Sequence, residues 1–291
     1  MKAVQKPQWL RRAFPLGSTF EKTRQILQKR NLRTVCQEAR CPNQWECFSK
    51  NTATFLLLGS VCTRNCRFCS VAPGEPLAED MLEPMKVAEA AKELGLKYVV
   101  LTSVTRDDLD DGGANVFVKT IQELKKRIKT IRIEVLIPDF NGDENALKAI
   151  VAAQPDVISH NMETILRLYS SIRPKASYHQ SLYIIQKIKE LNPKIVRKTG
   201  IMLGLGETRA EVIGLLQETH NASCQFLTIG QYLQPDPKAV PVERYIPPAE
   251  FEELKTIAQH IGFQQVASGP FVRSSYEAQA LYAARKKIKK R

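Results

Sequence analysis

Residues 54–69 read Thr-Phe-Leu-Leu-Leu-Gly-Ser-Val-Cys-Thr-Arg-Asn-Cys-Arg-Phe-Cys, and this stretch decides the fold. The apolar run 54–58 ends at Gly59 and predicts a buried strand, because short apolar runs closed by a turn residue are typical of strands covered on both faces. A polar loop with three cysteines follows the strand directly. These are Cys62, Cys66 and Cys69. We therefore expect thiolate ligands at the carboxyl end of a buried strand.

Strand-like and helical patterns alternate along the rest of the chain. The strand-like runs are 98–104, 132–138, 157–161, 200–205 and 226–231, and the helical patterns are 85–94, 116–129, 144–153, 178–191 and 210–219. Such alternation indicates βαβ units and a parallel sheet. Six strands are countable, so we predict an α/β fold, a partial (β/α)6 TIM-like barrel over 51–235, with its chemistry at the carboxyl ends of the strands. An N-terminal extension (1–50) and a C-terminal extension (236–291) flank it.

The composition of the 291 residues is that of a globular protein, with 43% hydrophobic and 25% charged residues. No stretch approaches the ~20 apolar residues that span a bilayer, and residues 1–20 lack the apolar core of a signal peptide. We therefore expect a cytoplasmic protein that does not enter a membrane. The net charge of +13 favours an anionic partner. Much of it lies in the basic segment 285–291, a kind of run that is typical of a solvated tail.

Six of the seven cysteines fall in two short groups. The first group is Cys36, Cys41 and Cys47, and the second is Cys62, Cys66 and Cys69. A disulfide framework is typical of short secreted chains, whereas crowded thiols in a cytosolic protein indicate metal ligands. The seventh, Cys224, stands in an apolar run and is predicted to be a small buried hydrophobe.

Zinc is the first metal to consider for these cysteines. Structural zinc takes four ligands, but each group supplies three thiolates, and the four histidines are all distant in sequence: His160, His179, His220 and His260. Three thiolates at short spacing favour a [4Fe–4S] cluster in which one iron has no protein ligand.

The spacing Cys-x3-Cys-x2-Cys after the first strand, with Phe68 just before the third cysteine, resembles the radical S-adenosylmethionine (SAM) superfamily. The resemblance implies that SAM chelates the open iron of the cluster. One electron then cleaves SAM and releases a 5′-deoxyadenosyl radical, which removes hydrogen from unactivated carbon.

Four loops after strands contain candidate SAM-binding residues. Gly112 and Gly113 permit close approach of a ligand, or simply a tight turn before a helix. Asn161 and Glu163 suit ribose hydroxyls, although Asn161 is equally suited to cap a helix. Arg173 suits a carboxylate, or is a surface arginine. Gly204 begins no dinucleotide fingerprint, but its backbone is placed to line an adenine or the sulfonium.

Several further motifs together resemble lipoyl synthase. They are the first cysteine group, Thr105-Arg106-Asp107-Asp108 with its Gly-Gly, His160-Asn161-x-Glu163-Thr164, Met202–Glu207, Gly230–Pro235 and Arg273-Ser274-Ser275-Tyr276. The resemblance covers residues 30–280. It departs from the family at Thr105, where members often have Asp, and the basic tail has no fixed counterpart. The segment 208–211, which follows Gly204 and Gly206, is not a dinucleotide fingerprint and is predicted to be the capping box of the next helix.

This resemblance implies sulfurtransferase activity. An octanoyl group on a lysine of a carrier protein receives sulfur at C6 and C8, and two SAM molecules are cleaved per product. The resemblance assigns the first cysteine group and a serine to an auxiliary [4Fe–4S] cluster that donates the sulfur. It points to Ser275 rather than Ser274. Without it, both hydroxyls are equally suited to cap a helix that begins near Glu277.

The resemblance also implies partners. The octanoylated carriers are the E2 lipoyl domains of 2-oxoacid dehydrogenases and the glycine cleavage H protein. A ferredoxin or flavodoxin supplies electrons, and an Fe–S carrier rebuilds the auxiliary cluster.

Two other functions remain open from the residues. The basic charge motivates a sulfur-inserting enzyme such as a tRNA methylthiotransferase, against which no separate RNA-binding domain is evident. A non-catalytic Fe–S electron carrier leaves the long barrel unexplained.

Overall fold

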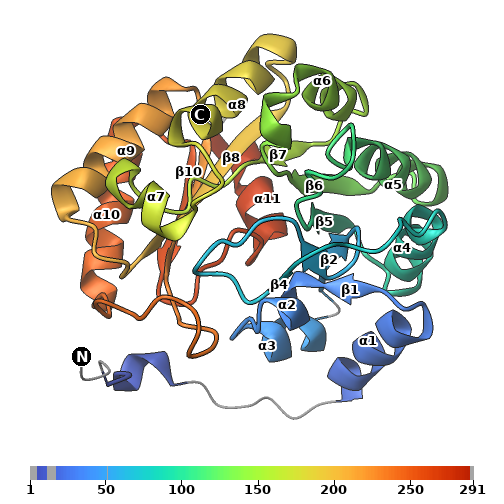
Figure 1. The fold of residues 1–291 in the computed structure, drawn as a ribbon, viewed down its shortest axis with the longest axis horizontal. Helices are drawn as coiled ribbons and strands as arrows, with labels where there is room; N and C mark the ends of the chain where they lie inside the picture. The colour runs from blue at the N-terminus through green and yellow to red at the C-terminus, as the bar shows by residue number, and fades with distance from the viewer. Residues whose placement is uncertain (1–4, 12–17, 51, 289–291) are drawn as a thin grey trace. The chain divides into compact units, whose positions relative to one another are not determined.

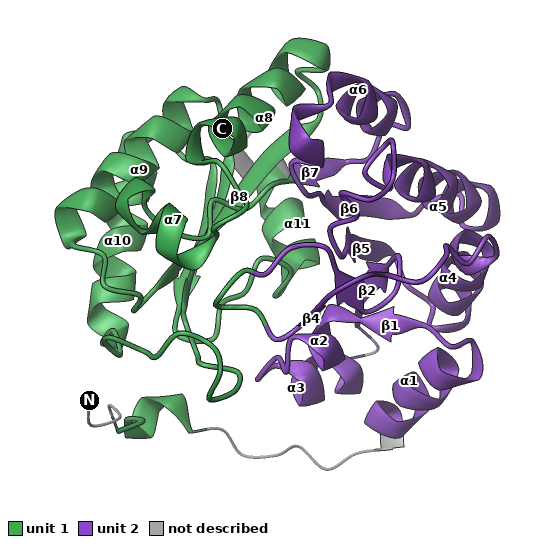
Figure 2. Cartoon of the chain, viewed as in Figure 1, with its two compact units in different colours: residues 1–12, 66–69, 159–291 green, residues 13–65, 70–158 purple. Residues whose placement is uncertain are grey.

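The computed structural model, shown in Figure 1, describes residues 5–11, 18–50 and 52–288. The chain divides into two compact units, coloured separately in Figure 2. Unit 1 comprises residues 1–12, 66–69 and 159–291, and unit 2 comprises residues 13–65 and 70–158. Both units consist of parallel strands joined by helices. None of the helices in the described ranges is long and apolar enough to cross a membrane.

Unit 2 contains a parallel sheet in which β2 (Thr54–Leu57), β5 (Tyr98–Ser103) and β6 (Arg132–Leu136) follow one another. Thr54 lies opposite Val100, and Tyr98 opposite Arg132. The strands are joined by α4 (Glu83–Glu93) and α5 (Ala114–Arg127), and α6 (Glu144–Ala152) follows β6. Every residue of β2 is buried, as its continuous apolar run predicts for a parallel strand covered on both faces.

The N-terminal part of unit 2 packs three helices beside β2. β1 (Arg33–Thr34) pairs with β2 in the antiparallel direction, and α1 (Ser18–Lys29), α2 (Val35–Glu38) and α3 (Gln44–Ser49) lie together below β1 in the view of Figure 1. After β2, β3 (Val61–Cys62) pairs with β4 (Ala72–Pro73) as a separate two-stranded ladder. A 3-10 turn, η2 (Phe140–Gly142), follows β6. Within unit 2, the first cysteine group and Cys62 therefore lie on short elements and turns that adjoin β2 in sequence.

Unit 1 contains a second run of parallel strands. β8 (Val196–Leu203) pairs with β9 (Phe226–Gln231), which pairs with β10 (Gln265–Gly269). Helices α8 (Tyr178–Leu191), α9 (Arg209–Asn221) and α10 (Pro248–Ile261) connect or cover them, and α11 (Ala278–Ile288) follows β10. Their apolar faces meet in one core that includes Leu216, Leu227 and Phe251. Shorter pieces are η1 (Gln8–Leu10), η3 (Leu166–Leu168) and α7 (Tyr169–Ile172).

All six strands and all five helices expected from the sequence are present, and β7 (Val157–Ser159) carries the chain from unit 2 into unit 1. The strand expected over 200–205 is the largest boundary error, because β8 begins at Val196. Arg197 and Lys198 made the start of this strand look like a loop. Both are buried, and the Arg197 guanidinium donates to the carbonyls of Ser223 and Ile195 at 2.9 and 2.8 Å.

Two elements in the C-terminal part differ from expectation. β10 and α10 were not predicted, since Gln-Val-Ala-Ser-Gly has too few apolar residues to stand out as a strand. The basic segment begins inside α11, which continues to Ile288, so at least its first part is helical. Residues 289–291 of the expected tail lie outside the described residues.

Candidate active site

The first cysteine group lies entirely in unit 2, on two short helices and the turn between them. Cys36 is on α2 and Cys47 is on α3. The backbone N–H of Cys41 donates to the carbonyl of Cys36 at 3.0 Å, and the N–H of Gln44 donates to that of Cys41 at 3.2 Å. α2 begins at a capping Thr34, whose hydroxyl accepts from the N–H of Gln37. These local bonds fix the backbone of the turn that carries Cys41 between α2 and α3.

Burial and neighbouring thiols raise the pKa of two of the three thiols in this group. Burial raises the pKa of Cys36 to about 12, and the neighbouring Cys41 thiolate raises it further. Burial likewise raises the pKa of Cys47 to about 12, with further contributions from Cys36 and Cys41. Because the thiolate is the metal ligand, iron bound here must displace these protons, and the positive charge of the iron favours that loss.

Helix α1 packs against α3, the helix that carries Cys47. Thr23, which is fully buried, donates its hydroxyl to the carbonyl of Phe48 at 2.9 Å. The rings of Phe20 and Trp45 stack at 4.2 Å between centroids. Stacking and a buried hydrogen bond join α1 to α3, so the helix that carries Cys47 is held by a neighbour that the sequence patterns did not predict.

The second cysteine group is divided between the units. Cys62 ends β3 in unit 2, and its carbonyl accepts from the N–H of Gly74 at 2.9 Å. The N–H of Arg64 donates to the Sγ of Cys62 at 3.4 Å. Cys66 and Cys69 belong to unit 1, where the N–H of Cys69 donates to the carbonyl of Cys66 at 3.0 Å.

Within unit 1, Arg67 and Phe68 anchor the segment between Cys66 and Cys69. The N–H of Arg67 donates to the carbonyl of Ile172 at 2.9 Å, and its carbonyl accepts from the N–H of Val240 at 2.9 Å. Phe68 packs against a small apolar core. Its buried members are Ile172, Leu205, Tyr232 and Val242. The two cysteines are thus held by main-chain bonds on both sides and by an aromatic anchor.

Arg64 was not among the expected site residues, yet it is the most heavily bonded side chain in the cysteine loop. It is only 5% exposed. Its guanidinium forms a two-point contact with Asp107, from Nε at 2.9 Å and Nη2 at 3.0 Å. A second two-point contact joins it to Asp139, including Nη1 at 2.7 Å, and Nη2 also donates to Asn141 Oδ1 at 2.7 Å. Asp107 follows β5 and Asp139 follows β6, so neither carboxylate is near Arg64 in sequence.

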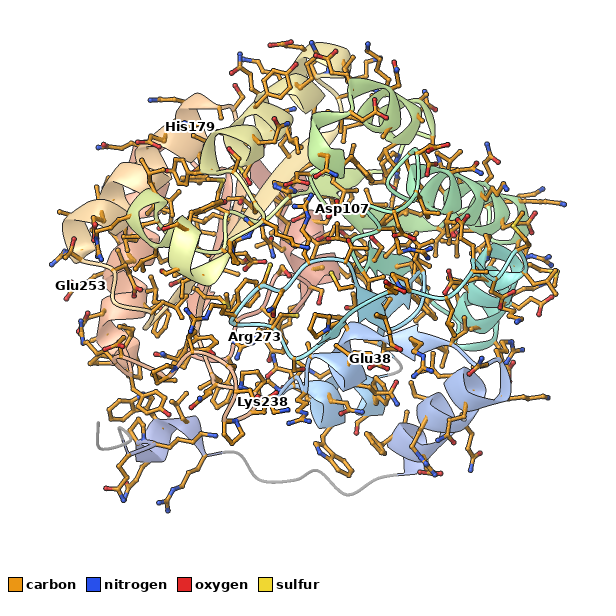
Figure 3. All side chains as sticks on the ribbon, in the orientation of Figure 1. Glu38, Asp107, His179, Lys238, Glu253 and Arg273 are labelled. Atoms are coloured by element: carbon orange, nitrogen blue, oxygen red, sulfur yellow. The ribbon has the colours of Figure 1, made fainter. Side chains whose placement is uncertain are left out.

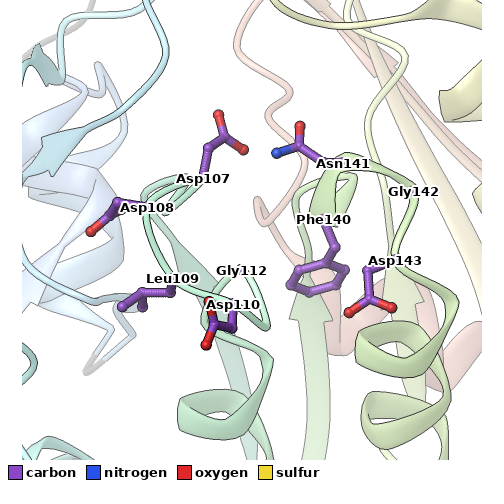
Figure 4. A pocket seen from close by; sticks show the side chains of 9 residues that line it. All are labelled: Asp107, Asp108, Leu109, Asp110, Gly112, Phe140, Asn141, Gly142 and Asp143. Atoms are coloured by element: carbon purple, nitrogen blue, oxygen red, sulfur yellow. The ribbon is translucent and has the colours of Figure 1, made fainter.

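The loops after β5 and β6 line a cavity of about 460 Å³ in unit 2 (Figure 4). Four of its lining side chains are carboxylates: Asp107, Asp108, Asp110 and Asp143. Gly112 also lines it, and Gly113 lies beside Gly112 in the left-handed region. A Cβ at 113 would approach Leu58 Cδ1 to 2.3 Å, and one at 112 would approach Phe140 Cδ1 to 2.9 Å. Close packing on both sides is therefore sufficient reason for the two glycines.

The loop after β7 brings together Asn161, Glu163 and Arg173 in unit 1. Asn161 Nδ2 donates to Glu163 Oε1 at 3.0 Å, and Arg173 Nη1 donates to the carbonyl of Asn161 at 3.1 Å. Arg173 is buried, not a surface arginine, and its guanidinium lies over the Tyr169 ring. Asn161 does not cap a helix, because the next helical turn is preceded by Ile165. Burial raises the pKa of the Glu163 carboxyl, and the nearby Arg173 opposes that rise.

Asn161 presents one buried acceptor that suits a bound ligand. Its Oδ1 has no hydrogen-bond partner within the described residues. It lies beside Gly200, where a Cβ would approach this oxygen to 2.9 Å. A buried acceptor without a partner is costly, and a ribose hydroxyl would satisfy it. The residues of this loop therefore fit the ribose of SAM.

Gly204 follows β8 and has a φ of +102°. A Cβ there would approach Gln231 Nε2 to 2.3 Å and the carbonyl of Arg244 to 2.4 Å, so only glycine fits. The Glu207 carboxylate accepts from the N–H groups of Gly204 and Leu205, at 2.6 and 2.9 Å. The capping box expected over 208–211 is confirmed at the start of α9.

The Arg273-Ser274-Ser275-Tyr276 segment forms a turn after β10 in unit 1, and Figure 3 labels Arg273 within it. Arg273 Nη1 donates to the carbonyl of Val272 at 2.7 Å. That same carbonyl lies against Gly230 of β9. Helix α11 begins at Ala278, one residue after the expected start. Two motifs that are distant in sequence therefore meet at Gly230.

The remaining cysteine matches its prediction, since Cys224 is 2% exposed, and burial raises the pKa of its thiol to about 12.

In the part of the chain that is described, no three His, Cys, Asp or Glu side chains converge on a point suited to a single metal ion. A four-iron cluster differs from such an ion, because each iron takes its own thiolate. Two groups of three thiols are therefore a donor set that fits two clusters.

Comparison with known proteins tests these expectations. The family model described as the Radical SAM superfamily matches residues 56–219. Among solved structures, methylornithine synthase is similar with a TM-score of 0.54 at 14% identity, covering 94% of each chain. The [FeFe]-hydrogenase maturase HydG is similar with a TM-score of 0.57 at 14% identity, covering 86% of this chain and 67% of its own. These matches confirm the predicted α/β fold class, and the superfamily confirms SAM and [4Fe–4S] clusters as cofactors.

Curated relatives are similar over nearly the whole chain. The lipoyl synthase of Caldanaerobacter subterraneus subsp. tengcongensis is 52% identical, covering 94% of this chain and 96% of its own length. That of Desulfotalea psychrophila is 51% identical, with coverage of 96% and 93%. A second family model, the N-terminal domain of lipoyl synthase, matches residues 1–41. With identity at this level across the whole length, the chain belongs to the lipoyl synthase family of the radical SAM superfamily.

Proposed function

We propose that this chain inserts sulfur at C6 and C8 of an octanoyl group that is linked to a lysine of a carrier protein. The observation that carries the proposal is the placement of the first cysteine group, in which Cys36 on α2, Cys47 on α3 and Cys41 in the turn between them are held by local main-chain bonds. A radical SAM enzyme that only cleaves SAM needs one cysteine group. A second group with three thiols supports a second cluster with a role of its own.

In this proposal the second cysteine group holds the cluster that binds SAM. Cys62, Cys66 and Cys69 would hold this cluster through their thiolates, with SAM as its remaining ligand. When bound, the cluster and SAM together supply one-electron chemistry strong enough to remove hydrogen from an unactivated carbon. The chain's own contribution is placement, because main-chain bonds at Arg67 and packing of Phe68 fix two of the three thiols.

Six residues are proposed to bind SAM. They are Gly112, Gly113, Asn161, Glu163, Arg173 and Gly204. Asn161 Oδ1 would accept from a ribose hydroxyl, and Glu163 would accept from another. The four carboxylates of the cavity beside Gly112 suit a cation, and SAM carries both a sulfonium and an ammonium group. Arg173 holds the Asn161 loop by bonding two of its carbonyls.

Cys36, Cys41, Cys47 and Ser275 are proposed as ligands of the auxiliary cluster, which is the sulfur source. Cys36 is buried, so a cluster bound there would be partly shielded from water at that ligand. A direct transfer of sulfur from the cluster avoids the need for free sulfide at this site. In this scheme residues 1–50 carry the auxiliary ligands, residues 51–235 carry the radical chemistry, and residues 236–291 contribute the serine.

The proposed partners follow from this chemistry. The carriers are E2 lipoyl domains and the glycine cleavage H protein, the electron donor is a ferredoxin or flavodoxin, and an Fe–S carrier rebuilds the spent cluster. The proposed site of action is the cytoplasm, and neither a membrane nor a nucleic acid takes part.

Anaerobic reconstitution with substitution of each cysteine group tests the proposal. The intact chain should bind about eight irons, since two four-iron clusters are expected. Cys62→Ala, Cys66→Ala and Cys69→Ala should abolish SAM cleavage, whereas Cys36→Ala, Cys41→Ala and Cys47→Ala should retain cleavage but transfer no sulfur to an octanoyl-lysine peptide, as read by mass spectrometry. Cys224→Ala is the matched control and should behave as the intact chain. Identical behaviour of the two cysteine groups in the cleavage assay would contradict the division of roles.

A further inference from the structure

The segment between Cys62 and Cys66 is held by side chains from two other loops of unit 2. Thr63 is bonded to the carbonyl of Thr105 twice, from its N–H and from its hydroxyl, both at 3.1 Å. Its hydroxyl also accepts from the N–H of Asp107 at 3.1 Å. The residue after it, Arg64, extends into the protein between Asp107 and Asp139. Figure 4 shows the Asp107 carboxylate and the Asn141 amide on facing loops, both directed toward the space between them.

Two-point contacts with two carboxylates restrain the Arg64 side chain in both position and orientation. Each of the two carboxylates accepts two bonds from the planar guanidinium, and Asn141 accepts a further one. Two-point contacts fix orientation as well as distance. The side-chain exposures of Arg64 and Asp139 are both 4%, so neither partner is screened by solvent. A buried arginine is costly unless its charge is paired and hydrogen-bonded, and here five oxygens on three residues accept from the guanidinium.

This anchorage has a direct consequence for Cys62. The backbone N–H of Arg64 donates to the Sγ of Cys62 at 3.4 Å. The direction of that N–H depends on the backbone conformation of residue 64, which is restrained by Thr63 on one side and by its own guanidinium on the other. A hydrogen bond to a cluster thiolate withdraws electron density from the sulfur and raises the reduction potential of the cluster.

We infer that Arg64 is a positioning residue that sets the reduction potential of the SAM-binding cluster, by holding its own backbone N–H on the Cys62 sulfur. The inference rests on the proposed assignment of Cys62 as a cluster ligand. It also gives Asp107, within the Thr105–Asp108 motif, a role that the sequence did not indicate, as one of the two anchors of Arg64.

The decisive variant is Arg64→Lys, because lysine keeps the positive charge but cannot make two-point contacts with two carboxylates. The measurement is a redox titration of the reconstituted full chain by electron paramagnetic resonance, following the reduced-cluster signal that changes when SAM is added. The midpoint potential should shift to a more negative value. A role of Arg64 through charge alone, or through stability alone, predicts an unchanged potential.

Arg106→Lys is the matched control. Arg106 is also buried and also makes a two-point contact with an aspartate, Asp108, and among the described residues its side chain has no hydrogen bond to the cysteine loop. Its substitution should leave the potential unchanged. If Arg64→Lys fails to load iron, Asn141→Gly serves in its place, since residue 141 has a φ of +50° that glycine adopts easily. It removes one acceptor and no charge, and it should give a smaller shift in the same direction.

The inference is wrong if the Arg64→Lys variant binds its full iron content and its cluster keeps the reduction potential measured in the intact chain. It is also wrong if the potential is unchanged in Asn141→Gly. A shift of equal size in Arg106→Lys would overturn it too, because the effect would not depend on the cysteine loop. The ligand assignment is tested separately by Cys62→Ala. If that variant keeps the SAM-responsive signal, the proposed function fails; if it loses the signal while Arg64→Lys leaves the potential unchanged, only the inference fails.

Discussion

The carboxylate of Glu83, at the start of α4, accepts a hydrogen bond from the backbone N–H of Leu58 at 2.9 Å. Leu58 is the residue directly after β2, and its φ of +67° is unusual for a leucine. Its side chain packs against Gly113, so the backbone at 58 is constrained from both directions. Glu83 therefore stabilises the turn that leads from the first parallel strand to Cys62.

The pH dependence of stability should reveal this contact. Burial raises the pKa of Glu83 to about 7, although the Leu58 N–H opposes the rise. A carboxyl whose pKa is raised by folding stabilises the folded state when it is protonated, so its contribution is complete below about pH 4.5 and is lost as the pH rises to about 7. The loss amounts to roughly 3 kcal/mol at most.

Glu83→Gln should remove this loss, because glutamine remains neutral and still accepts from Leu58. In urea unfolding of the metal-free chain, the variant should gain stability over the intact chain between pH 5 and pH 8. The same substitution at Glu89, which is further along α4 and partly exposed, is the control. A difference between Glu83→Gln and the intact chain that stays constant over this range would contradict the prediction.

Gly230→Ala should disturb the turn that contains Ser275. A Cβ at this position would lie 2.1 Å from the carbonyl oxygen of Val272, which is backbone and cannot move without moving the turn. We expect a destabilisation of about 1–3 kcal/mol, and a larger loss of lipoyl formation than of SAM cleavage. Both activities are measured in one reaction by chromatography and mass spectrometry.

Gly214→Ala is the matched control for this substitution. Apart from its chain neighbours and the backbone of α9 itself, no atom of the described residues lies within 4 Å of a Cβ at 214, in the middle of α9. Alanine favours a helix over glycine by about 1 kcal/mol, so this variant should be slightly more stable and fully active. An equal loss of both activities in Gly230→Ala would mean that the turn has no separate role in sulfur transfer.

The fold was predictable from sequence because its strands and helices have strong local patterns. The buried run 54–58 and the amphipathic helix over 116–129 are both present within two residues of their expected ends. β10 was not predictable in this way. Its Gln-Val-Ala-Ser-Gly sequence has little preference of its own, and it becomes a strand because it pairs with β9 at every residue. Tertiary pairing overrides weak local preference in such cases.

The site residues that are close together in sequence were predictable from their spacing. Side-chain contacts between residues that are distant in sequence were not. The cysteines are close in sequence, and their spacing was sufficient to propose ligands. Arg64 meets Asp107 and Asp139 only after β5 and β6 have been placed. No local pattern connects residues that far apart, and a single arginine in a polar loop is usually on the surface.

Assembly of the auxiliary cluster should depend steeply on pH. The thiolate is the metal ligand, and burial together with the neighbouring thiols raises the pKa of Cys36 and Cys47 to about 12. Iron must therefore displace protons that are held tightly. In a Cys62→Ala, Cys66→Ala and Cys69→Ala background, which leaves this group alone, iron affinity should rise about tenfold per pH unit for each proton released between pH 7 and pH 9. Anaerobic iron titration followed by visible absorbance measures it, and an affinity independent of pH would exclude buried neutral thiols.

Ser275→Cys tests whether an oxygen ligand matters for release of sulfur. Iron binds thiolate more persistently than a serine oxygen, since thiolate is the softer ligand. A cluster that must lose iron to expose its sulfur is helped by one weak attachment. Ser275→Cys should therefore retain both clusters and SAM cleavage but stop before lipoyl forms. Ser274→Ala, in the neighbouring position of the same turn, is the control and should have the milder effect. If Ser275→Cys and Ser275→Ala both form lipoyl at the full yield, as read by mass spectrometry, the serine has no part in the mechanism.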